Sequence, residues 1–130
     1  MELLEIYNKI LLSESAKIDD VRYAIKNRFK CRIYYDGDDP GGKGERIIEP
    51  VALGYSLKDL LVVRAWEDVG VSHSKITKNN PVPGWRLFRL DKIFTFHILN
   101  TKFNTKRPNY NPNGDKGMKR IIQNLNFNIK

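Results

Sequence analysis

The sequence predicts a mainly β protein with flanking helices, built on one antiparallel sheet of five strands that curls strongly on itself. Two observations support this fold class. Five short stretches between residues 30 and 99 alternate apolar and polar side chains, which is the period of a half-buried strand. Glycine, proline, asparagine and aspartate separate several of these stretches, and these residue types form the turns between consecutive strands. We therefore expect neighbouring strands to pair, with a helix over residues 19–28 closing one end.

Apolar side chains recur at helical spacing before the first expected strand. In residues 2–12 they are Leu3, Leu4, Ile6, Tyr7, Ile10 and Leu11, which predicts a short amphipathic helix. The helix over residues 19–28 begins with two aspartates, which suit the positive N-terminal end of a helix. The chain is thus expected to divide into an N-terminal helical segment (1–17), a β domain (18–103) and a basic, Asn-rich C-terminal extension (104–130).

The first three strands are expected at residues 30–36, 45–55 and 60–66. A loop rich in glycine and aspartate, residues 36–44, separates the first two. Pro50 lacks a backbone N–H, so it indicates an edge or a bulge in the second strand. The third strand is apolar except for Arg64, and we expect it to be buried. Residues 67–83, which include His73, form a long irregular connection of the kind that is often functional or mobile.

Residues 84–93, Gly-Trp-Arg-Leu-Phe-Arg-Leu-Asp-Lys-Ile, supply the fourth strand, and residues 94–99 supply the fifth. Alternation puts Trp85, Leu87 and Arg89 on one face of the fourth strand, and Arg86, Phe88 and Leu90 on the other. Each face therefore places an arginine among large apolar groups. A buried guanidinium is costly unless it is paired, so this pattern indicates either internal ion pairs or a site for an anion.

The net charge of +8 is concentrated near the C-terminus. Residues 1–101 hold 16 basic and 14 acidic side chains, a net of +2, whereas residues 102–130 hold 7 basic and 1 acidic, a net of +6. Residues 100–113 are expected to be a linker. Asp115 is expected to cap a helix over 115–126, because Met118, Ile121, Ile122 and Leu125 fall at helical spacing. A short isolated helix is marginal, so this one must dock on its own domain or on a partner protein.

Several functional classes find no support in the sequence. The single cysteine, Cys31, lacks the spaced partners of a zinc site, and it fits a reducing cytoplasm. No apolar run approaches the roughly 20 residues of a membrane span, and the N-terminus carries acids where a signal peptide carries bases. His73 and His97 have no visible catalytic partner. We expect no enzyme activity, no metal, no cofactor and no membrane partner.

Taken together, residues 18–103 resemble a WYL domain. The resemblance rests on Ile33-Tyr34-Tyr35, on Arg46-Ile47-Ile48-Glu49-Pro50, on Leu61 to Trp66, and above all on Trp85 to Ile93. Leu61-Val62-Val63 stands where the family has its naming tripeptide, and the family's N-terminal winged helix-turn-helix is absent from residues 1–17. The resemblance implies an Sm-like, strongly bent five-stranded sheet or barrel. It also implies a regulatory domain whose basic groove binds nucleic acid or a nucleotide-like ligand and signals to a partner.

The candidate ligand-binding residues are Arg46, Arg64, Arg86, Arg89, Tyr34, Tyr35 and Trp66. Guanidinium groups suit phosphate oxygens, and aromatic rings offer stacking surfaces for bases. In the alternative interpretation each arginine pairs with a nearby acid, chosen from Glu45, Glu49, Glu67 and Asp91, and ties strands together. The sequence therefore leaves two functions open. One is a module that binds nucleic acid or a nucleotide-like ligand. The other is a structural or protein-interaction module, viral in one interpretation, that uses the barrel as a scaffold and docks on a partner chain through residues 104–130.

Overall fold

The computed structural model of the protein describes residues 17–37, 43–70, 84–104, 106–112 and 114–125. The helix expected at residues 2–12 lies outside the described residues, as does most of the connection that contains His73.

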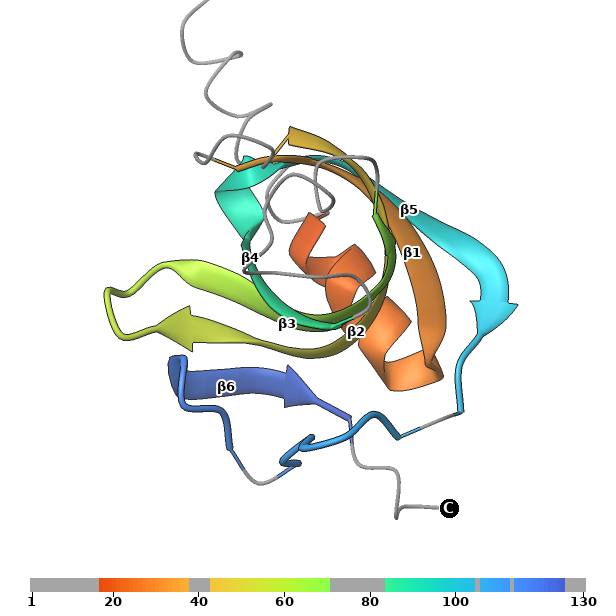
Figure 1. The fold of residues 1–130 in the computed structure, drawn as a ribbon. Helices are drawn as coiled ribbons and strands as arrows, with labels where there is room; N and C mark the ends of the chain where they lie inside the picture. Colours follow the sequence, from red (N-terminus) through yellow and green to blue (C-terminus); the bar gives the residue numbers. More distant parts are fainter. Residues whose placement is uncertain (1–16, 38–42, 71–83, 105, 113, 126–130) are drawn as a thin grey trace, which may run out of the picture.

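Six strands form one antiparallel sheet (Figure 1). They are β1 (Phe29–Asp36), β2 (Lys43–Ser56), β3 (Leu61–Gly70), β4 (Gly84–Arg89), β5 (Ile93–Lys102) and β6 (Met118–Asn124). The order β4-β3-β2-β1-β5 contains the five expected strands, so this part of the prediction is confirmed. The sheet curls without closing, because its end strands β4 and β5 do not pair with each other among the described residues. A short 3-10 turn, Leu90–Lys92, forms the kink between them.

The long strand β2 organises the sheet. Its first half pairs with β1, and its residues 52–56 pair with β6 along the same edge. The opposite edge pairs with β3 over residues 46–55. The pairing with β3 is irregular between Pro50 and Ala52, where a proline cannot donate a hydrogen bond. The connection expected to be irregular from Glu67 begins later, since β3 continues to Gly70.

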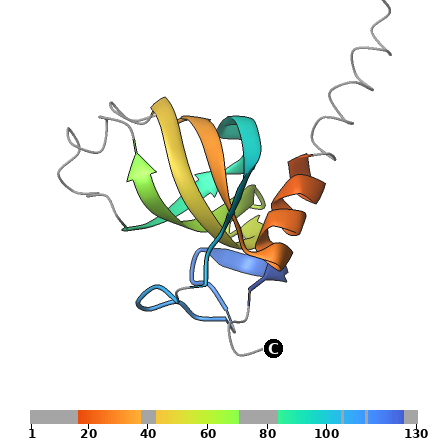
Figure 2. The ribbon, with the colours of Figure 1, turned by 90° about the vertical axis from the view of Figure 1, so that its right-hand side faces the viewer.

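A helix over residues 17–27 lies across one end of the curled sheet, as Figure 2 shows. Its residues Val21, Ala24 and Ile25 are fully buried and join the main core inside the sheet. The inward residues of the strands complete this core, among them Cys31, Ile33, Ile48, Val63 and Phe88. Burial raises the pKa of the Cys31 thiol to about 12, so this side chain remains protonated and acts as a small core residue.

The prediction of a helix at residues 115–126 is wrong, because residues 118–124 form the strand β6. Strand β2 offers free backbone groups along residues 52–56, and β6 satisfies them, whereas an isolated helix of this length is marginal in water. Gly54 makes the pairing possible, because a Cβ atom there would collide with the carbonyl oxygen of Arg120. Met118 and Ile121 pack on the outer face of the sheet, while Ile122 and Leu125 pack on the main core.

Candidate functional site

Strand alternation divides the predicted binding residues between two faces of the sheet. Arg46 lies opposite the buried Ile33 and Arg86 opposite the buried Ala65, while Tyr35 follows Ile33 by two residues, so all three belong to the inner face. Arg64 and Trp66 alternate with the buried Val63 and Ala65 of β3, so they belong to the outer face. The structure therefore does not bring the seven residues into one open groove.

The inner arginines share one carboxylate. Glu67 is fully buried, and its Oε1 lies 2.9 Å from Arg46 Nη1 and 3.2 Å from Arg86 Nε. The guanidinium of Arg46 also lies over the rings of Tyr35 and Phe88, 5.5 and 5.7 Å from their centres. These contacts match the internal ion-pair interpretation, and they explain how two arginines fit inside a small sheet.

Arg89 and Tyr34 lie apart from both arginine sites. The guanidinium of Arg89 forms two hydrogen bonds with the partly exposed Asp91, of 2.7 and 3.1 Å, while its backbone N–H donates to the Tyr35 hydroxyl. Tyr34 is exposed and stacks on Phe94, with 6.1 Å between the ring centres. Neither side chain approaches Arg64 through any contact recorded among the described residues.

Arg64 binds the C-terminal segment, by which we mean the described part of residues 103–125. Its Nε and Nη2 donate to the two carboxylate oxygens of Asp115, at 2.7 and 2.9 Å. Asp115 also accepts a hydrogen bond of 2.8 Å from the Gly117 backbone, so it forms a turn instead of capping a helix. Burial alone would raise the pKa of Asp115, but the hydrogen bonds from Arg64 and Gly117 outweigh burial and lower the pKa.

A second bidentate pair fastens the segment further along. Arg107 donates to both carboxylate oxygens of the buried Glu49, at 2.7 and 3.0 Å, and its guanidinium lies over the ring of Trp66. Lys30 lies 3.5 Å from the same carboxylate and 2.9 Å from Asp68. The hydrogen bond from Arg107 to Glu49 outweighs desolvation and raises the pKa of Arg107. Trp66 is thus covered by the protein's own C-terminal segment.

Aromatic contacts align the segment with β4. The indole N–H of Trp85 donates to the carbonyl oxygen of Pro108 at 2.7 Å, and its ring stacks on Tyr110 with 5.9 Å between the centres. The Tyr110 hydroxyl donates to the carbonyl oxygen of Leu125, and burial raises the pKa of Tyr110 to about 12. Asn109 takes a left-handed backbone conformation with φ 65°, which asparagine tolerates better than most residues.

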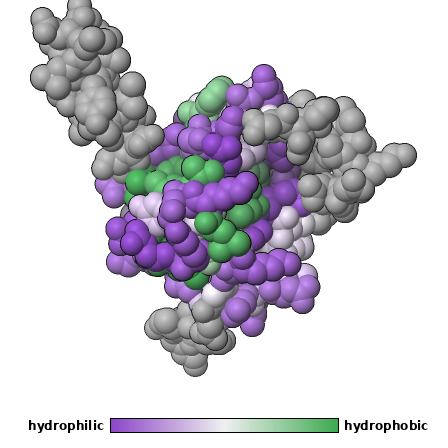
Figure 3. Space-filling model, turned by 90° about the vertical axis from the view of Figure 1, so that its left-hand side faces the viewer, coloured by the Kyte–Doolittle hydropathy of each residue, from purple (hydrophilic) through white to green (hydrophobic). Residues whose placement is uncertain are grey.

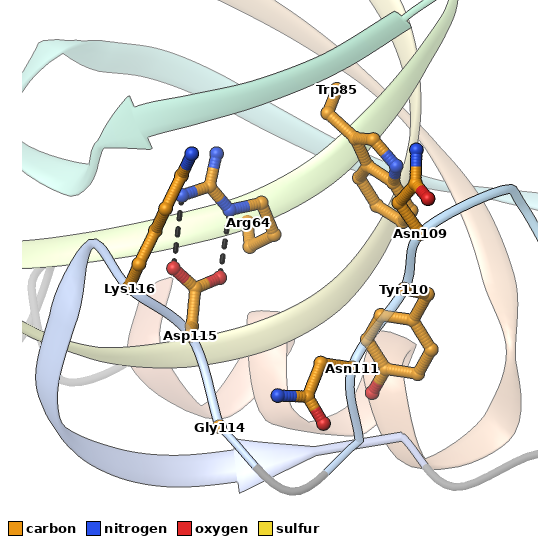
Figure 4. A pocket seen from close by; sticks show the side chains of 8 residues that line it. All are labelled: Arg64, Trp85, Asn109, Tyr110, Asn111, Gly114, Asp115 and Lys116. Atoms are coloured by element: carbon orange, nitrogen blue, oxygen red, sulfur yellow. Dashed lines mark hydrogen bonds and ion pairs between the residues drawn. The ribbon is translucent and has the colours of Figure 1, made fainter.

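A pocket of about 550 Å³ lies between the sheet and this segment (Figure 4). Its lining residues are Arg64, Trp85, Asn109, Tyr110, Asn111, Gly114, Asp115 and Lys116. In Figure 4 the side chain of Lys116 runs alongside Arg64, and Trp85 with Asn109 lies across the pocket from them. Arg64 Nη1 makes no hydrogen bond to any residue that the structure describes. The pocket therefore has a cationic end and an end rich in aromatic and amide groups.

Sequence analysis missed most of this pocket. Residues 100–113 were expected to form a linker, and no local pattern connected them with Trp85. A signal was present in Pro108-Asn109-Tyr110-Asn111-Pro112, where two amides flank an aromatic ring between prolines. Such a run suits a binding loop as well as a linker, and only the contact with Trp85 distinguishes the two.

Within the ranges that the structure describes, no helix has the length and apolarity to cross a membrane. The same residues contain no cluster of three or more histidine, cysteine or acidic side chains that could hold a metal ion.

Among solved structures, the chain is similar to proteasome accessory factor B/C (PafBC) of Arthrobacter aurescens, with a TM-score of 0.53 and 20% sequence identity. The match covers 75% of this chain and 13% of the PafBC chain. At this identity the likeness concerns the fold alone, and it supports the WYL-like fold that the sequence predicts. No protein-family model matches the sequence, and no curated protein matches it.

Proposed function

We propose that the protein is a non-enzymatic regulatory module that binds a phosphate-bearing ligand, either nucleotide-like or single-stranded nucleic acid, at the Arg64 pocket. The main observation is that Arg64 lines this pocket and that Asp115 binds its Nε and Nη2, while Nη1 makes no hydrogen bond within the described part of the chain. Asp115 also fixes the direction of the guanidinium, so its remaining N–H groups are oriented before a ligand arrives.

Three features support this proposal. Lys116 is exposed and adds a second positive charge at the same end of the pocket. The half-buried ring of Trp85 offers apolar surface for a base. The net charge of +6 over residues 102–130 attracts anions and speeds encounter. The resemblance of residues 18–103 to WYL domains also implies the same ligand class. In this proposal Arg46, Arg86, Arg89 and Tyr35 support the frame, since they are engaged with Glu67 and Asp91 or with each other.

Fluorescence anisotropy with labelled single-stranded oligonucleotides and labelled nucleotides tests the proposal. We expect binding that weakens steeply with salt, as counterion release requires. Lys116→Ala removes one pocket cation from an exposed position, so it should weaken binding while leaving the fold intact. Lys58→Ala is the matched control, because Lys58 is exposed at the turn between β2 and β3 and does not line the pocket. Absence of binding at low salt would overturn the proposal.

A protein-interaction module is the second candidate, and two observations favour it. Apolar side chains gather on the face that presents the turn between β2 and β3 (Figure 3), where Leu57 and Leu60 are 70% and 37% exposed. Strand β6 pairs with β2, and no other described strand pairs with it, so residues 118–124 still offer a strand edge to a partner. Leu57→Ser with Leu60→Ser should abolish a partner contact at the turn without affecting ligand binding in the pocket.

A further inference from the structure

We propose that the pocket takes a single mononucleotide-sized ligand and not a continuous strand, and that Arg107 is a positioning residue for this ligand. This inference rests on the proposed function and specifies three properties of the ligand. They are its size, its orientation in the pocket and the part of the chain that recognises it.

The size of the pocket favours a small ligand. A volume of about 550 Å³ lies within the roughly 300–1,000 Å³ that is usual for small-molecule sites. Strand-binding sites on small β barrels cover about 4–16 nucleotides and run along open grooves. Here the C-terminal segment lies over the sheet and supplies six of the eight lining residues, so a continuous strand would have to displace it.

The two ends of the pocket give the ligand a direction. The cationic end holds Arg64 and Lys116 against the single carboxylate of Asp115, which leaves one net positive charge for a phosphate. The opposite end holds the Trp85 ring and the amide of Asn109, as Figure 4 shows. An amide supplies both donors and an acceptor, which match the polar edge of a base, and the ring offers its apolar surface.

Arg107 controls the pocket without lining it. The lining residues of the C-terminal segment lie between the ion pair of Arg107 with Glu49 and the strand β6, which begins at Met118. Loss of the Arg107 pair removes one of the contacts that order this end of the stretch, beside those of Trp85 with Pro108 and Tyr110, so a ligand must supply more of the order at the cost of binding free energy. Lys119 also belongs to the C-terminal segment, but its exposed ion pair with Asp59 lies beyond the lining residues and does not hold either end of them.

Isothermal titration calorimetry on the full chain tests both parts, with AMP and an oligodeoxynucleotide of about eight nucleotides as probes. We expect one AMP per chain, and an affinity for the oligonucleotide that does not exceed the affinity for AMP. An oligonucleotide that binds much more tightly than AMP, and is weakened by Lys116→Ala, would overturn the inference and leave the proposed function standing. No binding of either probe at low salt would instead overturn the proposed function itself.

Two variants test the positioning role of Arg107. Arg107→Gln should weaken AMP binding by about tenfold, within the range typical of coupled sites. Lys119→Gln, the matched control, should leave it unchanged. Amide hydrogen exchange should show faster exchange in residues 107–117 of free Arg107→Gln and recovery when AMP saturates it, while β1 and β3 stay protected in both states. Unchanged AMP affinity in a folded Arg107→Gln chain would overturn the positioning role.

Discussion

Glu67 and Asp115 each neutralise arginine, but in different surroundings. Glu67 is fully buried among inner residues, and both of its arginine partners come from strands of the same sheet. Asp115 belongs to the C-terminal segment and pairs with Arg64 across the junction between segment and sheet, beside a pocket. The comparison shows that paired arginines can have two roles. The inner pairs hold strands together, whereas the outer pair also presents a guanidinium to a cavity.

Deletion of residues 104–130 should have the largest effect on stability. It removes Leu125 and Ile122 from the main core and leaves residues 52–56 of β2 without β6. We expect a loss above the roughly 2–5 kcal/mol typical of removing one buried leucine, with a cooperative transition retained. Thermal and urea unfolding measure both quantities. The boundary between residues 103 and 104 remains a prediction, and loss of the cooperative transition would place the segment within the domain.

Glu67→Gln should break the inner cluster. The substitution removes the charged carboxylate that Arg46 and Arg86, both largely buried, share. Breaking a buried pair in this way typically costs about 3–5 kcal/mol, which a lower midpoint of urea unfolding would show. Asp91→Asn is the control, because it removes the acid from the partly exposed pair with Arg89 and should cost less than about 1 kcal/mol. Equal losses in the two variants would mean that burial does not distinguish these pairs.

Gly54→Ala should selectively loosen the pairing of β6 with β2. The added methyl group meets the backbone of β6, so we expect a cost of about 1–3 kcal/mol and faster amide exchange in residues 118–124. Gly114→Ala is a matched control, since the nearest atom to its Cβ would be an Asn111 side-chain nitrogen at 3.8 Å. If the exchange of β6 in Gly54→Ala remains as slow as in the unaltered chain, the close approach at Gly54 does not hold the segment.

Lowering the pH should weaken the attachment of the C-terminal segment through Asp115. This is the smallest of the four effects that we expect. Its pKa is lower in the folded chain than in the unfolded chain. The unfolded state therefore binds more protons, and the stabilisation is present above the usual aspartate pKa of about 4 and disappears as the pH falls through the folded value. Asp115→Asn should be less stable than the unaltered chain at neutral pH and converge with it in acid. Parallel stability curves from pH 7 to pH 2 would contradict this.

The sequence predicted the sheet well because its signals are local. Alternation in residues 30–36 and 84–90, the turn residues between strands and the proline bulge each depend on a few neighbouring positions. The inner cluster was partly predictable too. Arginines among apolar residues required partners, and Glu67 was among the acids considered, although the sharing of this one carboxylate by Arg46 and Arg86 depends on strand register.

The C-terminal segment was decided only by the tertiary structure. The spacing of Met118, Ile121, Ile122 and Leu125 satisfies a helix, yet an open edge of β2 favours a strand there. The pocket likewise arises where the lining residues of the C-terminal segment, from Asn109 to Lys116, meet Arg64 and Trp85, which lie between 24 and 52 positions away in the chain. Sequence alone therefore determined the curled sheet and the need for charge partners. Only the folded chain determined which acid each arginine meets, because that choice depends on contacts between distant segments that no local pattern encodes.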